Sequence, residues 1–212
     1  SRYALEYPYP MGGYGGMFKA WSSKVARQGI HEPYNSCGNG SAMRIAPVGW
    51  AFETEREVLA AAEVSASCTH NHPEGIKGAQ ATALCIFLAR QGHTASDIRA
   101  RIERDFGYDL SMSVKELQRR YSWQGIDGKG DGGICQDSVP QAIICALQAK
   151  DFEDAIRNAI SIGGDSDTIG CIAGGIAEAL YGIPESIKER AWKYLDETEG
   201  RTVRSFIQKY SI

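Results

Sequence analysis

Helical periodicity, introduced repeatedly by helix-capping sequences, is the feature that most constrains how this chain folds. Thr54-x-x-Glu57 and Ser113-x-x-Glu116 are capping boxes, in which the first and fourth residues bond to each other's backbone N–H. Ala79, Ala83 and Phe87 recur every four residues, as on one face of a buried helix. No segment shows the alternation of polar and apolar residues that is typical of a β-strand. The sequence therefore predicts an all-α fold.

The helical pattern covers most of the chain after its first forty residues. Those forty residues are rich in Gly, Pro, Tyr and Asn and are expected to form loops around one short helix. At 212 residues the chain is long enough for a full core, and it shows no internal repeat, so residues 1–212 are expected to form a single domain. We expect helices over 18–27, 55–68, 79–88, 95–106, 114–121, 139–150, 152–160, 169–180, 184–195 and 201–208.

Composition argues against several classes of protein. The 23 Lys and Arg residues against 26 Asp and Glu give a net charge of −3, which offers no excess of positive charge for general nucleic acid binding. No apolar run approaches the roughly 20 residues of a membrane-spanning helix. The six cysteines form no C-x-x-C pair and are interpreted as small buried apolar residues in a reducing compartment. We expect a soluble cytoplasmic protein without membrane partners.

The segment Gly163-Gly-Asp-Ser-Asp-Thr168 is the strongest candidate for chemistry, because it leads directly into an apolar helix. Asp165, Asp167 and Thr168 offer oxygen ligands that suit a hard cation such as magnesium, manganese or calcium. The same residue types also cap helices, and spacing alone does not separate the two interpretations. Capping needs one oxygen rather than three, and no Lys or Arg lies within the turn, so a bound cation is favoured.

Four stretches of the sequence together resemble the ADP-ribosylglycohydrolase family, which includes the dinitrogenase reductase-activating glycohydrolases. The turn at Gly163 and the helix that follows it, up to Pro184, are similar to the C-terminal signature of that family. The other three stretches are Gly38-Asn-Gly-Ser-Ala-Met-Arg-Ile-Ala-Pro-Val-Gly49, Thr69-His-Asn-His-Pro-Glu-Gly-Ile-Lys-Gly-Ala79 and Asp137-Ser-Val-Pro140. Each alone is typical of an ordinary turn or helix start. Their joint order carries the resemblance, which extends from Tyr9 onward.

The resemblance implies a compact orthogonal helical domain and a specific hydrolytic activity. A family member would hydrolyse the glycosidic bond between ADP-ribose and a protein side chain or small acceptor, with two Mg²⁺ ions as cofactor and Mn²⁺ as a possible substitute. Its partner would be an ADP-ribosylated protein or an ADP-ribose derivative. Asp165 and Asp167 would be catalytic and, with Thr168, would hold the metal. Arg44 is expected to be a structural anchor. Two loops would offer backbone N–H groups to the diphosphate: the substrate-binding residues would be Gly38, Asn39, Gly40, Ser41, His70, Asn71, Glu74 and Gly75.

One family feature has no counterpart in the sequence. Family members usually carry a Thr-Asp-Asp-Thr-like motif near the N-terminus that supplies the other half of a two-magnesium cluster, and no Asp-Asp pair occurs here. We therefore expect the domain to be truncated at its N-terminus. The alternative is a catalytically silent member of the same fold that binds ADP-ribose or has a structural role. A helical interaction scaffold, with neither binding nor metal dependence, is a further alternative.

Overall fold

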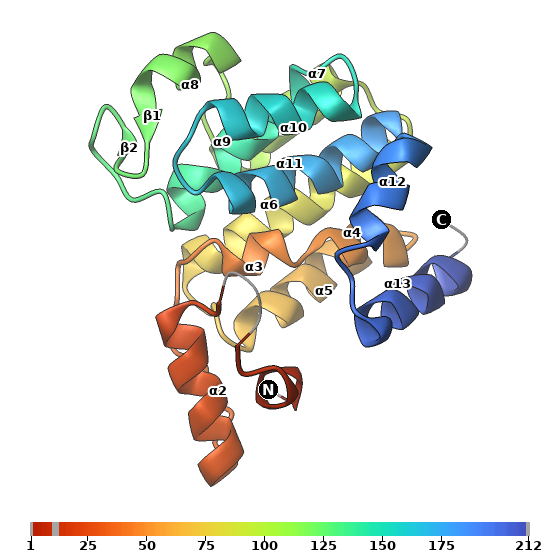
Figure 1. Ribbon diagram of the computed structural model, residues 1–212. Coiled ribbons are helices and arrows are strands. Elements are labelled where there is room, and N and C mark those ends of the chain that lie inside the picture. The colour runs from red at the N-terminus through yellow and green to blue at the C-terminus, as the bar shows by residue number, and fades with distance from the viewer. Residues whose placement is uncertain (1, 10–12, 211–212) are drawn as a thin grey trace.

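The structure, a computed structural model, describes residues 2–9 and 13–210. Within these residues the chain forms thirteen helices and one short hairpin (Figure 1), so the all-α class is confirmed. The helices are α1 (Arg2–Glu6), α2 (Gly16–Gln28), α3 (Gly40–Met43), α4 (Ala46–Ala51), α5 (Glu55–Ser67), α6 (Pro73–Arg90), α7 (Ala95–Phe106), α8 (Val114–Arg120), α9 (Cys135–Leu147), α10 (Phe152–Ser161), α11 (Ser166–Tyr181), α12 (Glu185–Trp192) and α13 (Glu197–Tyr210). The strands are β1 (Tyr121–Ser122) and β2 (Gly125–Ile126).

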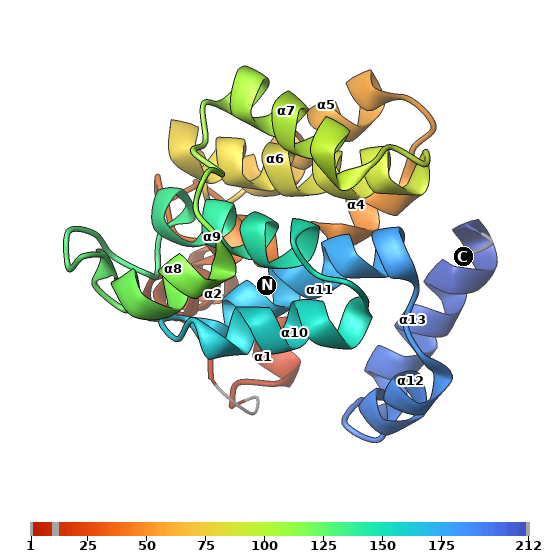
Figure 2. The same ribbon diagram turned by 90° about the horizontal axis from the view of Figure 1, so that it is seen from above.

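Helix α6 is the centre of the fold. Residues 81–89 of this helix are all buried, and it packs against α3, α4, α5, α7, α9 and α11. Figure 2 shows the resulting layers, with α5, α6 and α7 on one side, α9 and α11 in the middle and α10 on the other. The predicted apolar stripe of α11, which includes Ile169, Ile172 and Ile176, is buried in this middle layer.

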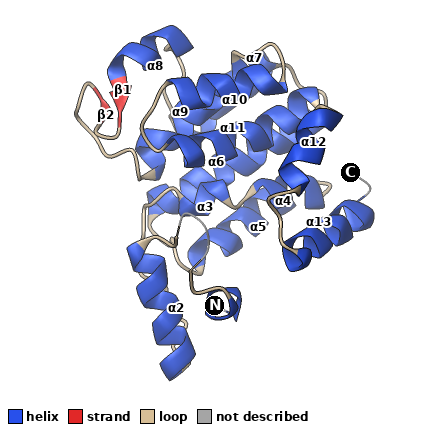
Figure 3. Cartoon of the chain, in the orientation of Figure 1, coloured by secondary structure: helices blue, strands red, loops and turns tan. Residues whose placement is uncertain are grey.

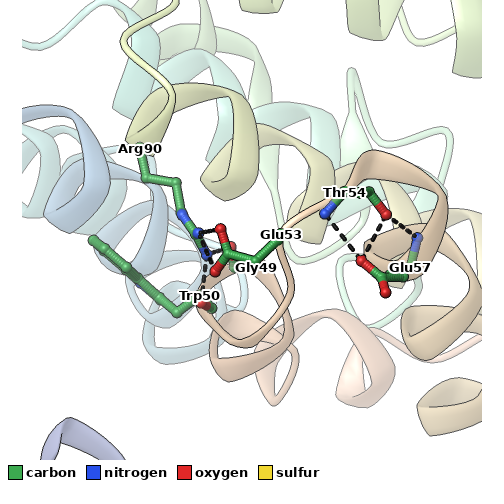
Figure 4. A network of polar contacts seen from close by, with 6 residues as sticks. All are labelled: Gly49, Trp50, Glu53, Thr54, Glu57 and Arg90. Atoms are coloured by element: carbon green, nitrogen blue, oxygen red, sulfur yellow. Dashed lines mark hydrogen bonds and ion pairs between the residues drawn. The ribbon is translucent and has the colours of Figure 1, made fainter. Parts of the chain in front are cut away.

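Both predicted capping boxes form, and they fix where their helices begin. Thr54 Oγ1 accepts the N–H of Glu57 at 3.3 Å, and the Glu57 carboxylate accepts the N–H of Thr54 at 3.1 Å (Figure 4). The same reciprocal bonds join Ser113 and Glu116 at the start of α8. Each N-cap contributes about 1 kcal/mol to stability, because it satisfies N–H groups that have no partner within the helix.

Arg90, at the end of α6, binds the C-terminal end of the neighbouring helix α4. Its guanidinium donates to the carbonyl oxygens of Gly49, at 3.3 Å, and of Trp50, which lie in the last turn of α4, and it pairs with Glu53 at 3.3 Å (Figure 4). The last carbonyl groups of a helix have no partner within it, so Arg90 supplies the missing donors. This contact ties α4 to the central helix.

The structure corrects several details of the predicted elements: α6 begins at Pro73 and α13 at Glu197, six and four residues before the expected starts. Two short helices, α3 and α4, occupy residues 40–51, where Gly40, Pro47 and Gly49 conceal the helical pattern. Helix α9 begins at Cys135, four residues before the predicted Val139; Pro140 is tolerated near its start, although it lacks the N–H of a helical bond. The expectation of no strand is also wrong, since β1 and β2 pair antiparallel (Figure 3).

The expected environment of the cysteines is only partly met. Cys85, Cys135 and Cys145 are buried, whereas Cys68 and Cys171 lie in exposed positions and Cys37 is half-buried. None of the helices in the described part of the chain combines the length and the apolar character that a membrane crossing requires.

Candidate active site

The turn between α10 and α11 holds the two candidate aspartates. Gly163 and Gly164 both adopt left-handed backbone angles, with φ of 74° and 68°. A side chain at Gly164 would lie 2.5 Å from the Tyr121 ring, so this position requires glycine for space as well as for conformation. The tight turn brings Asp165 to the N-cap position of α11, with Asp167 and the buried Thr168 in the first turn of the helix.

Asp165 occupies the capping position but does not act as a cap. Its side chain makes no hydrogen bond to the N-terminal N–H groups of α11. Instead its Oδ2 atom accepts a hydrogen bond of 2.6 Å from the side-chain amide of Asn39. Asp167 behaves more locally, because its Oδ1 atom accepts the N–H of Thr168 at 2.9 Å. Simple helix capping therefore accounts for Asp167 but not for Asp165.

The two carboxyl groups interact directly, and this separates their pKa values. Burial raises the pKa of Asp165, which the hydrogen bond from Asn39 partly opposes and the neighbouring Asp167 reinforces. The pKa of Asp167 is lowered, first by its hydrogen bond with Asp165 and then by the Thr168 N–H. Two carboxylates this close repel each other unless a proton or a cation lies between them. The pair can therefore hold either one.

The segment before α3 supplies Asn39. The N–H of Asn39 donates to Gly133 at 3.0 Å, and its side-chain amide donates to Gly132 at 3.2 Å as well as to Asp165. An isolated bridge between Gly38 and Ile134 continues this pairing. Helices α3 and α11 lie side by side (Figure 1), so the loop before α3 meets the turn before α11. Residues 126 positions apart in the sequence are thus brought into direct contact.

The two segments that were predicted as diphosphate-binding loops are packed against each other, and part of each is helical, since Gly40 and Ser41 begin α3 and Gly75 lies in α6. The buried Ser41 hydroxyl donates to the carbonyl oxygen of Gly75 at 2.7 Å. A side chain at Gly40 would lie 3.1 Å from His70 Nε2, and one at Gly75 would lie 2.6 Å from the Ser36 carbonyl oxygen. Ser41 and Gly75 therefore join the loops from inside, while Gly40 provides room for the His70 ring.

His70 is buried between the loops in its neutral form. Burial, followed by the charge of Arg44, lowers the pKa of His70 to about 4. Its Nδ1 atom lies 2.7 Å from the hydroxyl of Thr69, which in turn accepts a hydrogen bond from Arg44 at 3.0 Å. Arg44 also donates to the carbonyl oxygen of Ser65 at 2.7 Å, which makes it a structural anchor as expected.

The predicted substrate-binding residues Asn71 and Glu74 make their described contacts with other parts of the chain than the aspartate turn. Asn71 is exposed, and its Oδ1 atom accepts the N–H of Asn35 at 2.8 Å. Glu74 is half-buried and pairs with Lys77 at 3.5 Å. Asn71 lies on the loop that leads into α6, whereas Glu74 lies in the first turn of α6.

Sequence reasoning missed the role of Tyr121 and of the glycine-rich segment beside it. Tyr121 packs against Gly164, and its buried hydroxyl has no hydrogen-bond partner among the described residues. Burial and the charge of Asp165 raise the pKa of Tyr121. Asp137, which belongs to one of the four stretches that resemble the family, accepts the N–H of Asp131 at 2.9 Å and so folds the segment that carries Gly132. No local sequence motif predicts these contacts.

The oxygen atoms at the turn suit a hard cation but form a small set. Asp165, Asp167 and Thr168 supply two carboxyl groups and a hydroxyl, the donors that Mg²⁺ and Mn²⁺ prefer. The Thr168 hydroxyl lies close enough to Asp165 to lower the pKa of that carboxyl group. Within residues 2–9 and 13–210, no three or more Asp, Glu, His or Cys side chains converge as metal ligands. The residues therefore fit one edge of a cation's coordination shell.

A separate cavity of about 890 Å³ lies between α10 and α12. Its lining is mainly apolar and includes Phe152, Ile156 and Ile187 but none of the candidate residues. The chemistry of the turn, rather than the size of this cavity, identifies the candidate site.

Comparisons with known proteins agree on one family. The sequence model of a family described as ADP-ribosylglycohydrolase matches residues 6–210. The chain is 31% identical over 250 residues to ADP-ribosylhydrolase ARH3 of Homo sapiens, an alignment that covers 93% of this chain and 68% of that protein. It is 28% identical over 171 residues to ADP-ribosyl-[dinitrogen reductase] glycohydrolase of Rhodospirillum rubrum, covering 75% of this chain and 53% of that protein.

The structural comparison gives the same result. A solved structure described as an ADP-ribosylglycohydrolase-related protein complex superimposes with a TM-score of 0.71 at 25% identity, covering 100% of this chain and 72% of that one. Among the curated relatives, the chain spans 62% of the ARH3 protein of Danio rerio and 64% of that of Mus musculus. The match is thus to a large part of these proteins rather than to their whole length.

Proposed function

The chain belongs to the ADP-ribosylglycohydrolase family, and from this premise we propose that it hydrolyses the glycosidic bond between ADP-ribose and a protein side chain or small acceptor. The named activities of the relatives support the proposal, since both the human and the bacterial relative are named as hydrolases of ADP-ribosyl groups. The substrate would be an ADP-ribosylated protein or an ADP-ribose derivative, and water would be the second reactant.

The observation that carries the proposal is the Asp165–Asp167 pair. A half-buried carboxyl group at the start of a core helix, which does not cap the helix and interacts with a second carboxyl group, has no evident structural use. Its arrangement is typical of a site that binds a cation or transfers a proton. The pair also lies within the stretch that matches the family.

We propose that Asp165, Asp167 and Thr168 hold Mg²⁺, with Mn²⁺ as a possible substitute. When bound, such a cation would polarise the bond to be cleaved and lower the pKa of a water molecule. The residues of the chain would hold the carboxyl groups in place, Asp165 through Asn39 and Asp167 through the Thr168 N–H.

The two loops would bind the ADP-ribose diphosphate, as their resemblance to the family implies. The N–H of Gly40 has no hydrogen-bond acceptor among the described residues and lies in a half-buried position, which leaves it available to an anion. The neutral His70 ring beside Gly40 would give that part of the site a polar but uncharged wall. Ser41 and Gly75 are buried and would act by holding the loops together.

The test is release of free ADP-ribose from a protein that carries it, measured by chromatography with Mg²⁺ present. Asp167→Ala should abolish release while the circular dichroism spectrum stays helical, because the loss of one first-turn contact costs only about 1 kcal/mol. Asp154→Ala, which removes a comparable N-terminal carboxylate from α10, serves as the control and should retain activity. Substrates linked through serine and through arginine should be compared side by side. Full activity of Asp167→Ala would contradict the metal role.

A second candidate function is binding of ADP-ribose without turnover. The small donor set favours it, since only two carboxyl groups and a hydroxyl gather at the turn within the described residues. Calorimetric titration with ADP-ribose distinguishes the two. Affinity that is unchanged by a chelator, with no hydrolysis of any ADP-ribosylated substrate, would support the silent binder over the enzyme.

A further inference from the structure

We propose that Asn39 is a positioning residue that keeps the Asp165 carboxyl group from collapsing onto the end of α11, and so keeps it available to a cation. The proposal deepens the proposed function and rests on it for the identity of the ligand. It assigns to Asn39 a role different from the substrate contact that the family resemblance implies.

The first step of the argument is what Asp165 does not do. An aspartate at an N-cap position ordinarily accepts the N–H of the second or third helical residue, here Asp167 or Thr168. That bond is missing, and the N–H of Thr168 is taken by Asp167. A rotation of the Asp165 side chain would therefore be enough to form the capping hydrogen bond.

The second step is the hydrogen bond that prevents this rotation. The Asn39 side-chain amide donates to Asp165 Oδ2 at 2.6 Å from a residue that is only 7% exposed. Hydrogen bonds to charged groups are stronger than those between neutral groups, and this one is shielded from water. It holds one oxygen of Asp165 and keeps the carboxyl group beside Asp167 and Thr168, the other two proposed ligands.

The third step is that Asn39 itself is fixed from several directions. Its second amide hydrogen is directed at the carbonyl oxygen of Gly132 at 3.2 Å, and its backbone N–H donates to Gly133 at 3.0 Å. Both side-chain donors are thus in use within the protein, and only the Asn39 Oδ1 atom remains for other contacts. An amide with its donors occupied is suited to orienting a carboxylate rather than to binding a diphosphate.

The experiment compares Mn²⁺ binding by the full chain in the wild type, Asn39→Ala, Asn39→Leu and Asn158→Ala. Leucine has the same number and branching of side-chain heavy atoms as asparagine, so it removes the donors without leaving a cavity. Asn158 is the matched control, because it makes an amide-to-carbonyl bond of 3.5 Å to Cys145 away from the site. The Mn²⁺ dissociation constant should rise about 10- to 100-fold in both Asn39 variants, as when an outer-shell partner of a ligand is removed, and should stay unchanged in Asn158→Ala.

A second readout does not depend on metal. Without Asn39, the Asp165 carboxyl group should turn to the N-terminus of α11, so the amide of Asp167 should exchange its hydrogen more slowly in metal-free Asn39→Ala than in the wild type. A merely structural asparagine would instead speed exchange around the turn.

The outcomes separate this proposal from the proposed function. Unchanged Mn²⁺ affinity in the Asn39 variants would overturn the positioning role, as would unfolding of both variants under conditions where Asn158→Ala stays folded. If the wild type binds Mn²⁺ no better than Asp167→Ala, the metal part of the proposed function fails on its own. Amide exchange then decides the positioning role, which slower exchange of Asp167 supports and equal or faster exchange overturns.

Discussion

The helices around the aspartate turn and the two C-terminal helices are built in opposite ways. Helix α11 buries its apolar stripe completely, and it packs against α6, α9 and α10. The turn before it is packed so closely that Gly164 has no room for a side chain. Helix α12 has no buried residue, and α13 buries only Gly200. In Figure 1 these two helices lie at one edge of the molecule, away from the junction of α3 and α11.

The difference indicates where precision is needed. A carboxyl pair that handles a proton or a cation must be held within a fraction of an ångström, and a rigid, close-packed junction provides this. The C-terminal helices contribute little apolar burial to that junction within the described structure. Substitutions in the two regions should therefore have very different effects.

The largest contrast is expected between two isoleucines. Ile176→Ala removes a side chain that is 0% exposed in α11 and should lower the free energy of unfolding by about 2–5 kcal/mol, because it leaves a cavity in the core. Ile207→Ala, at 39% exposure in α13, should cost less than about 1 kcal/mol. Urea unfolding followed by circular dichroism measures both. Equal losses would show that α13 is as well packed as α11.

A smaller loss of stability should follow from adding a side chain at a glycine in a close helix contact. An alanine Cβ at Gly78 would lie 2.5 Å from the Sγ atom of the buried Cys135, so Gly78→Ala should destabilise the protein by about 1–3 kcal/mol. Since Cys135 also donates to Gly38 at 3.2 Å, activity should fall by more than the loss of stability explains. Gly16→Ala is the control, because a side chain there meets nothing within 4 Å and alanine favours the helix. A stable, fully active Gly78→Ala protein would contradict the close packing.

The smallest predicted effect is a pH dependence that comes from His70. Its folded pKa of about 4 lies below the ordinary value of 6.5, so the unfolded chain binds more protons between these values. The free energy of unfolding should therefore fall as the pH drops from about 6.5 toward 4, by up to about 3 kcal/mol from this group and by roughly 1–2 kcal/mol once screening by nearby solvent is included. His70→Asn should flatten the dependence over that range, and the exposed His31→Asn should not. An unchanged slope in His70→Asn would place the acid sensitivity elsewhere.

Local hydrogen-bonding patterns made much of the fold predictable. Thr54, Ser113 and their partners three residues later fix where α5 and α8 begin, because both partners belong to the same turn. The apolar stripe of α11 is likewise a property of one segment. Where a helix runs through proline or glycine, as around Pro47 and Pro140, the same local rules misplace or miss it.

The arrangement of the candidate site was less accessible from sequence. The turn could be singled out because its carboxyl groups are clustered along the chain, and the family resemblance added the loops at Asn39 and His70. The bond between Asn39 and Asp165 joins residues that local patterns cannot relate, and the same holds for Tyr121 against Gly164. Such contacts depend on how helices pack, and packing is decided by the whole core.

The central claim is that the turn before α11 serves a metal-dependent hydrolase of ADP-ribosyl bonds. The most direct measurement follows release of ADP-ribose from an ADP-ribosylated protein in one sample with Mg²⁺, after addition of a chelator, and again after excess Mg²⁺. Release should proceed, stop and resume. Release that continues in the chelator, or that never occurs at any Mg²⁺ concentration with any linkage, would contradict the claim.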